Sequence, residues 1–147
     1  MKLRNALTVF VVAGLVVGVG GCGQQSAERD RNVDGGLTCA QGGPCEIGDI
    51  GPGGGIVFST QANGGANLEA APVNGVAAWG CGNSRVTTSG GLGDGAADST
   101  VVAACDQSDS VTAAELAESF SYAGSTDWYL PSVAELKLLY ANRSALD

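Results

Sequence analysis

The stretch STDWYLPSVAELKLLY, residues 125–140, decides the fold expected for this chain, because a strand-like run leads directly into its clearest helix. Ser132 and Glu135 follow Pro131 at the spacing of a capping box, in which each side chain accepts a hydrogen bond from the other residue's backbone N–H. A helix is therefore expected to begin after Ser132. Its apolar stripe comprises Val133, Leu136, Leu139 and Tyr140.

The run TDWYLP in front of this helix predicts a short strand. Because successive side chains of a strand point to opposite faces, Trp128 and Leu130 are expected on one side and Tyr129 on the other. Aromatic rings at a surface can stack on sugar rings, so Asp127, Trp128 and Tyr129 are candidate ligand contacts. Packing in a small core is the more frequent use of such rings.

The glycine-rich run GDIGPGGGIVF, residues 48–58, invites a comparison with phosphate-binding loops. It lacks the Lys and Ser/Thr that follow the glycines of a Walker loop, and it lacks the third glycine of the dinucleotide fingerprint. We therefore interpret it as a turn in which Pro52 fixes φ. A strand is expected to begin at Ile56.

Two short strands and a helix are expected further along the chain. LEAAP (68–72) and VAAWGC (76–81) predict strands joined by the turn VNG, with Trp79 as a core anchor. A later helix would present an apolar face made of Ala113, Leu116, Ala117 and Phe120.

The run TTSGGLGDGAADST, residues 87–100, predicts a loop. Asp94 and Asp98 are conceivable calcium ligands, but the residue order of an EF-hand is absent and its bidentate glutamate is missing, so we expect no metal. Ser99 or Thr100 is expected to cap a short helix that follows. Together these elements predict an α+β fold with short strands and two to three helices.

The first 22 residues, MKLRNALTVFVVAGLVVGVGGC, have the order of a bacterial secretory signal. Basic residues come first, a mostly apolar run follows over residues 6–19, and Val19-Gly20-Gly21-Cys22 matches a lipoprotein box. The alternatives are an ordinary signal peptide and a transmembrane helix. Since a bilayer core needs about 20 apolar residues, the run is short for a span, and we expect residues 1–21 to be a lipoprotein signal peptide.

Lipidation is therefore expected at Cys22, the first residue of the processed chain. Acyl chains such as palmitate each contribute about 0.8 kcal/mol per buried methylene, and several chains together give a stable anchor. The predicted location is the bacterial cell envelope, with the membrane as a partner through this lipid. Residue 23 is Gly and not the Asp that retains lipoproteins in the inner membrane, which favours the outer membrane in a Gram-negative source.

Processing would leave 126 residues (147 − 21), enough for one domain. Residues 22–36 are polar and free of aromatics, and they predict a flexible tether to a domain at 37–147. Loss of Lys2 and Arg4 takes the formal charge from −8 to −10, which disfavours nucleic acid and other polyanions. The chain has no histidine, which excludes His-based triads and the usual zinc and haem ligands, so we expect no cofactor.

Four cysteines follow Cys22, and an even number in an exported chain indicates two disulfides. Three pairings are possible, and the one that joins neighbours is Cys39 with Cys45 and Cys81 with Cys105. The two loops would contribute about 2 and about 3.5 kcal/mol through chain entropy. A four-cysteine zinc site is the alternative, but the chain has no Cys-x-x-Cys pair.

In combination these motifs resemble the Lcl C-terminal domain family, named after a bacterial collagen-like surface adhesin. The resemblance spans residues 46–147 and implies a C-type-lectin-like α+β fold on secreted or surface-anchored proteins, with adhesion or ligand binding proposed and no established catalytic residues. It rests on IGDIGPGGGIVF, LEAAP, AAWGC, the cysteine at 105 and the 125–140 stretch.

The chain departs from the family pattern after the third helix. Family members continue with an aromatic-serine strand motif and a closing Val-Arg strand, whereas this chain ends at YANRSALD. A partial, disulfide-supported fold is therefore expected, in which Trp79, Trp128 and Leu136 lack part of their cover. Each large side chain contributes roughly 1.5–3 kcal/mol when fully buried, so the domain is expected to be marginally stable.

Two function classes follow from these observations. The first is a non-enzymatic binding or adhesion domain on a lipid tether, with a carbohydrate or protein ligand. The second is a remnant or variant of an enzyme of the related formylglycine-generating fold, or a non-functional truncated product. That chemistry needs a reactive thiol, and no nucleophile with a matched base is evident, so we expect no enzymatic activity.

Overall fold

The computed structural model describes residues 7–9, 12–13, 36–60, 67–72, 75–79, 81, 85–105 and 111–146. Residues 22–35 of the predicted tether, which include Cys22, lie outside these residues. Within the described part, no helix is both long and apolar enough to cross a bilayer.

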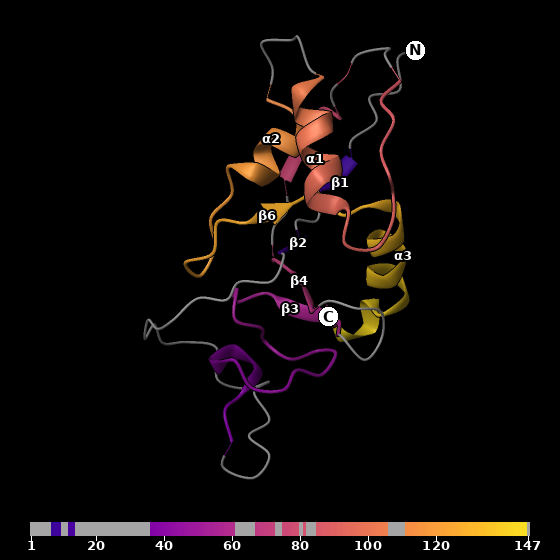
Figure 1. The fold of residues 1–147 in the computed structure, drawn as a ribbon. Helices are drawn as coiled ribbons and strands as arrows, with labels where there is room; N and C mark the ends of the chain where they lie inside the picture. Colours follow the sequence, from indigo (N-terminus) through magenta and orange to yellow (C-terminus); the bar gives the residue numbers. More distant parts are fainter. Residues whose placement is uncertain are drawn as a thin grey trace.

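Two small antiparallel sheets and three α-helices make up the described α+β fold (Figure 1). The four-stranded sheet has the spatial order β3 (Ile56–Ser59), β4 (Leu68–Ala70), β2 (Val12–Ala13), β6 (Trp128–Tyr129). The second sheet pairs β1 (Leu7–Val9) with β5 (Gly75–Ala77). The helices are α1 (Gly95–Ala104), α2 (Ala113–Glu118) and α3 (Val133–Ala141), with 3-10 turns η1 (Cys39–Gln41) and η3 (Arg143–Ala145).

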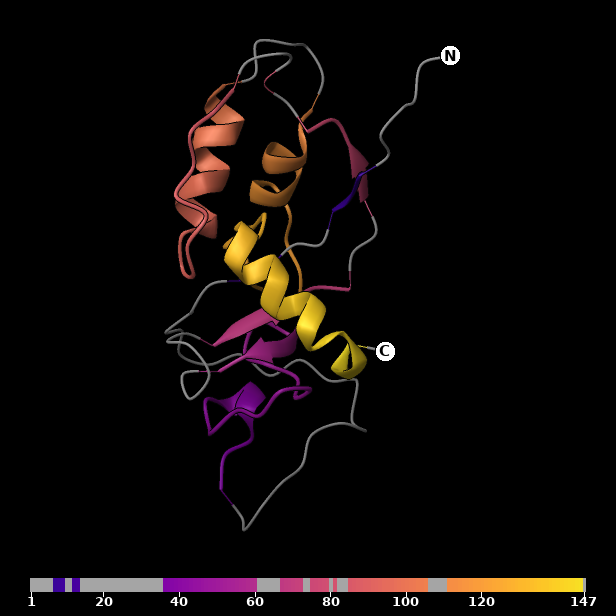
Figure 2. The same cartoon turned by 90° about the vertical axis from the view of Figure 1, so that its right-hand side faces the viewer.

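Strand β6 lies between two hydrophobic clusters. Its Trp128 belongs to the cluster formed with helices α1 and α2, and its neighbour Tyr129 belongs to the cluster formed with β3, β4 and α3. In Figure 2, α1 and α2 lie beside each other, and α3 crosses in front of β3 and β4. The predicted alternation of Trp128 and Leu130 against Tyr129 is confirmed, since Leu130 shares the cluster of Trp128.

Helix α3 begins where its capping box predicts, whereas α2 ends at Glu118, before Phe120, the last residue of its predicted apolar face. Thr112 and Ser132 are the N-caps of α2 and α3, and each accepts a hydrogen bond from the backbone N–H of the glutamate three residues later. Each glutamate in turn accepts one from the N-cap backbone, so both capping boxes are complete. Strands at Ile56 and Leu68 are also confirmed.

Helix α1 begins earlier than predicted, at Gly95. Asp98, in its first turn, accepts hydrogen bonds from the N–H groups of Ser89 and Gly90, both at 2.8 Å. Ser99 is not the helix cap, because its hydroxyl is bonded to the backbone of Leu130. The start of the helix is therefore set by the preceding loop and by β6, which the local sequence does not reveal.

Two further predictions about packing are wrong. Trp79 is 54% exposed and does not anchor the core, because β5 pairs with β1 at the side of the molecule. The two predicted strands are present as β4 and β5 in different sheets, and residues 73–74 of the turn VNG between them lie outside the described residues. On α3, Leu139 is 6% exposed and Leu136 is 46% exposed, so only part of the predicted stripe is buried.

Candidate functional site

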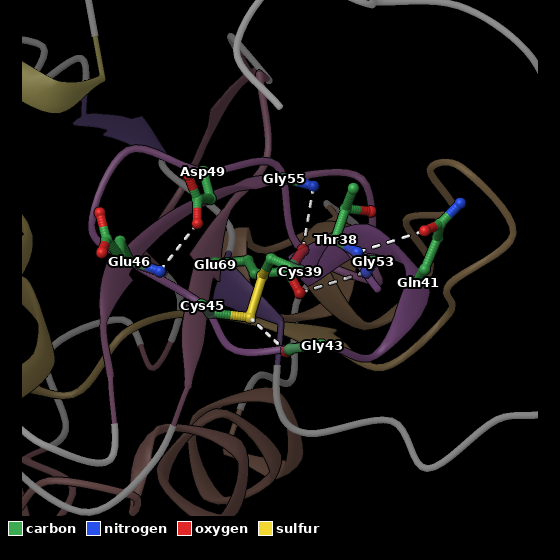
Figure 3. The surroundings of a disulfide bond; sticks show 10 residues. All are labelled: Thr38, Cys39, Gln41, Gly43, Cys45, Glu46, Asp49, Gly53, Gly55 and Glu69. Atoms are coloured by element: carbon green, nitrogen blue, oxygen red, sulfur yellow. Dashed lines mark hydrogen bonds between the residues drawn. A yellow bond between two sulfur atoms is a disulfide. The ribbon is translucent and has the colours of Figure 1, made fainter. Parts of the chain in front are cut away.

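The glycine-rich run forms a tight turn around a carboxylate of its own chain (Figure 3). The Gly54 N–H donates to the Gly51 carbonyl at 2.9 Å, which closes the turn. The N–H groups of Gly53 and Gly55 donate to the two carboxylate oxygens of Glu69, at 3.2 and 3.0 Å. The prediction of a turn is confirmed, and two backbone donors that a phosphate would need are occupied.

Close approach of strand β4 explains why glycines line this turn. A Cβ atom at Gly51 would lie 2.1 Å from the Cδ of Glu69, and one at Gly55 would lie 2.8 Å from the carbonyl oxygen of Ala70. Real Cβ atoms do not approach other atoms so closely. The glycine spacing therefore follows from packing of the turn on β4.

Glu69 is a buried acid, 7% exposed, that the sequence analysis did not single out. Burial raises the pKa of its carboxyl, the two glycine amides oppose this shift, and the nearby charge of Asp127 adds to it. A signal was available in the sequence, since LEAAP places one glutamate inside an otherwise apolar strand. An incoming phosphate would meet this carboxylate, so the turn is unsuited to anions.

The candidate ligand contacts at 127–129 are divided by the fold. Asp127 is exposed, whereas Trp128 and Tyr129 are buried at 2% and 6% exposure. The indole N–H of Trp128 donates to the Ser125 carbonyl at 3.2 Å, and the ring meets Phe120 edge to face with centroids 5.9 Å apart. These two aromatic rings therefore pack in the core and are not available to a ligand. Core packing is the more frequent role of such rings in a small domain.

Glu135 links three elements next to this strand. Its side chain is fully buried, and it accepts hydrogen bonds from the Ser132 N–H at 2.8 Å and from the Gly93 N–H at 2.9 Å. The Tyr129 hydroxyl donates to the same carboxylate at 3.4 Å. Burial raises the pKa of the Tyr129 phenol, and the charge of Glu135 adds to the shift. This arrangement positions α3 and offers no free acid or base.

Asp94 and Asp98, the conceivable calcium ligands, both accept hydrogen bonds from groups of this chain. Both oxygens of Asp98 accept backbone N–H groups, and Asp94 accepts the hydroxyl of Ser89. Among the described residues no group of three metal-ligating side chains comes together. The loop interpretation holds up to residue 94, and residues 95–100 are helical.

The four cysteines after Cys22 form the predicted disulfides, Cys39–Cys45 and Cys81–Cys105. The first closes the short η1 turn, and the second joins the segment after β5 to the end of α1 (Figure 3 shows the first). Neither pair is available as a thiol nucleophile.

Large apolar side chains are exposed at several places in the described structure, among them Leu37, Val101, Val111 and Tyr122, and two further sets each lie on or near one element. On α3 they form what we call the α3 apolar face, made of Val133, Leu136 and Tyr140. Near β5 they are Val76 and Trp79. Incomplete cover was expected for Trp79 and Leu136, and both are exposed, whereas Trp128 is covered.

The sequence analysis also missed strands β1 and β2, which lie in the predicted signal peptide. Val12 and Ala13 are in register with Ala70 and Glu69 of β4 on one side and with Tyr129 and Trp128 of β6 on the other. A run of β-branched residues is compatible with a strand as well as with the apolar part of a signal. Val12 and Ala13 of the predicted leader therefore occupy an interior position in the four-stranded sheet.

No family model, curated protein or solved structure matches this chain. The likeness to the Lcl C-terminal domain family therefore stays a proposal that rests on the quoted motifs.

Proposed function

We propose that this chain is a lipid-anchored bacterial envelope protein whose single domain binds a ligand and performs no catalysis. The observation that carries the proposal is that four of the five cysteines form disulfides with one another, which leaves Cys22. Cys22 stands in a lipoprotein box, and the four other cysteines are joined in pairs. Cys22 thus has no cysteine partner left among them and is available for the lipid.

The absence of catalysis is supported by how the buried acids are used. Glu69, Glu135 and Asp98 each accept hydrogen bonds from donors of this chain. An enzyme related to the formylglycine-generating fold would need a reactive thiol, whereas Cys81 and Cys105 are bonded to each other. No observation favours that second function over the first.

A binding role is supported by the exposed apolar side chains. Large apolar side chains at a surface are typical of interaction sites, and here they lie on α3 and beside β5. Trp128 and Tyr129 are in the core, and the exposed rings of Trp79 and Tyr140 lie among aliphatic side chains, Val76, Val133 and Leu136. Such a mixed apolar surface favours a protein ligand, with a carbohydrate as the alternative. The C-type-lectin-like family assignment remains part of the proposal.

Lipidation is tested by replacing Cys22 with Ser in cells fed a clickable fatty acid. The parent is expected to carry the label, while Cys22→Ser is expected to lose it and to retain residues 1–21, because the peptidase acts on the lipidated cysteine. The matched control is the double variant Cys39→Ser/Cys45→Ser, which should keep the label. Equal labelling of Cys22→Ser and the parent would overturn the proposal.

A further inference from the structure

Strand β2 occupies a position between two strands that do not pair with each other. The sheet order is β3, β4, β2, β6, so β2 is the only strand that connects β6 to the rest of this sheet as described (Figure 1). It is antiparallel to both neighbours, with Val12 opposite Ala70 and Tyr129. Strand β1, a few residues earlier, pairs in the same way with β5.

The same residues are those that processing before Cys22 would remove, and at this point the inference rests on the proposed function. Without residues 1–21, β4 and β6 would each present an unpaired edge toward the other. Unpaired backbone N–H and C=O groups away from water cost free energy comparable to a lost hydrogen bond. A strand that enters there can pair on both sides, which an ordinary sheet edge does not allow.

The surroundings define what kind of strand fits. Ala70, Trp128 and Tyr129, which flank the position, are all buried, and the fourth flanking residue, Glu69, is buried with its carboxylate bonded to the turn at Gly53 and Gly55. Val12 and Ala13 occupy the position. The sequence run to which they belong, LTVFVVA (7–13), carries no charge and is rich in β-branched residues. Such residues suit a strand that is covered on both faces. A charged or proline-containing strand would not fit.

We propose that the space between β4 and β6 is a strand-acceptor site. In the processed protein it binds an extended, uncharged, β-branched segment of another polypeptide, which runs antiparallel to both β4 and β6. Val12 and Ala13 fill the same site when the N-terminal segment is retained. The partner is thus recognised by main-chain hydrogen bonds on two sides and by the apolar character of its side chains.

The site is tested first in the purified, oxidised full chain that carries Cys22→Ser. Val12→Pro removes a donor from β2, and Val17→Pro, the same substitution at a position that belongs to none of the described strands, is the matched control. The probe is a fluorescent peptide with the sequence of residues 6–14 and lysines at its ends. We expect the peptide to bind the Val12→Pro variant at least about tenfold more tightly than the Val17→Pro variant. Equal affinities would overturn the proposal.

A second measurement covers the case in which Val12→Pro does not fold, as judged by loss of its two disulfides in a peptide map. The lipidated protein isolated from membranes should bind the same peptide and should not bind a version with proline at the Val12 position. Absence of binding, or a dimer that the peptide does not displace, would overturn the proposal. The mass of the N-terminal peptide reports processing separately, so a failed lipoprotein assignment is distinguishable from a failed acceptor site.

Discussion

Ser99 and Leu130 exchange two hydrogen bonds although 31 positions separate them. The Leu130 N–H donates to the Ser99 hydroxyl oxygen at 2.8 Å, and that hydroxyl donates to the Leu130 carbonyl at 3.2 Å. One side chain on α1 thereby satisfies both backbone groups of Leu130, the residue that follows β6. Helix α1 is thus joined to the end of this segment by a pair of hydrogen bonds, one to the backbone N–H and one to the backbone carbonyl of the same residue.

Ser99→Ala should leave both backbone groups of Leu130 without these partners. Because Leu130 is buried, the free energy of unfolding is expected to fall by about 1–3 kcal/mol. The adjacent Thr100 is exposed, and Thr100→Ala should change it by no more than about 0.5 kcal/mol. Urea titrations followed by circular dichroism measure both, and similar losses in the two variants would contradict the assignment.

Glu135→Ala should destabilise the domain more than Glu115→Ala, although both residues complete capping boxes. Glu135 is fully buried and also accepts the Gly93 N–H, whereas Glu115 is exposed. Each buried donor left unsatisfied costs about 1–3 kcal/mol. Thermal unfolding of the two variants gives the comparison, and a larger loss for Glu115→Ala would show that Glu135 does not link the elements.

Two leucines of α3 provide a test of which face of the helix is covered. Leu139→Ala should lower the free energy of unfolding by about 2–5 kcal/mol, because this side chain packs in the cluster with Phe58 and Tyr129. Leu136→Ala should cost less than about 1 kcal/mol, because Leu136 is 46% exposed. The measurement is chemical denaturation of the oxidised protein. Equal costs would mean that another segment covers the α3 apolar face.

The start of α3 and its capping box were predictable because the signals are local. The burial of its stripe was not, because periodicity identifies an apolar face without identifying what packs on it. Leu139 meets β3 and β4, while Val133, Leu136 and Tyr140 meet solvent in the described structure. Likewise, Trp79 has the composition of a core residue, and its exposure follows from the lateral position of β5.

Glu69 makes the stability of the domain depend on pH. Its folded-state pKa is raised above the ordinary value of 4.5, chiefly by burial. Well below pH 4.5 the Glu69 carboxyl is protonated in both the folded and the unfolded chain, and its contribution to the free energy of unfolding is fully present. As the pH rises through the folded-state pKa, that stability is lost, since the unfolded chain releases its proton first. The excess stability of the parent over Glu69→Gln should therefore shrink as the pH increases from 4 to 8.

The control for this prediction is Glu46→Gln, which removes an equal charge from an exposed side chain. Measured over the same pH range, this variant corrects the Glu69→Gln series for the loss of one charged side chain. Urea unfolding at each pH supplies the free energies, and a parent-minus-variant difference for Glu69→Gln that does not change with pH would contradict a raised pKa at Glu69.

The candidate site was predictable only in part. The turn at residues 48–58 and both disulfides follow from glycine, proline and cysteine positions. That Glu69 accepts hydrogen bonds from this turn could not be predicted. Glu69 lies 14 positions from Gly55, and only strand pairing brings the two residues together. The strand at Val12 was missed because β-branched apolar residues suit a membrane-directed leader and a sheet equally well.

The directions of the strands decide what happens if β2 is withdrawn. Since β4 and β6 are each antiparallel to β2, they are parallel to each other. Direct closure of the gap would require a parallel ladder, with a different hydrogen-bond pattern, and a shift of β6 by about one strand spacing of 4.8 Å. Trp128 and Tyr129 hold β6 in two clusters at once, so such a shift would disrupt both. The gap is thus preorganised. Because β4 and β6 do not close on each other, an incoming strand does not have to separate them before it pairs.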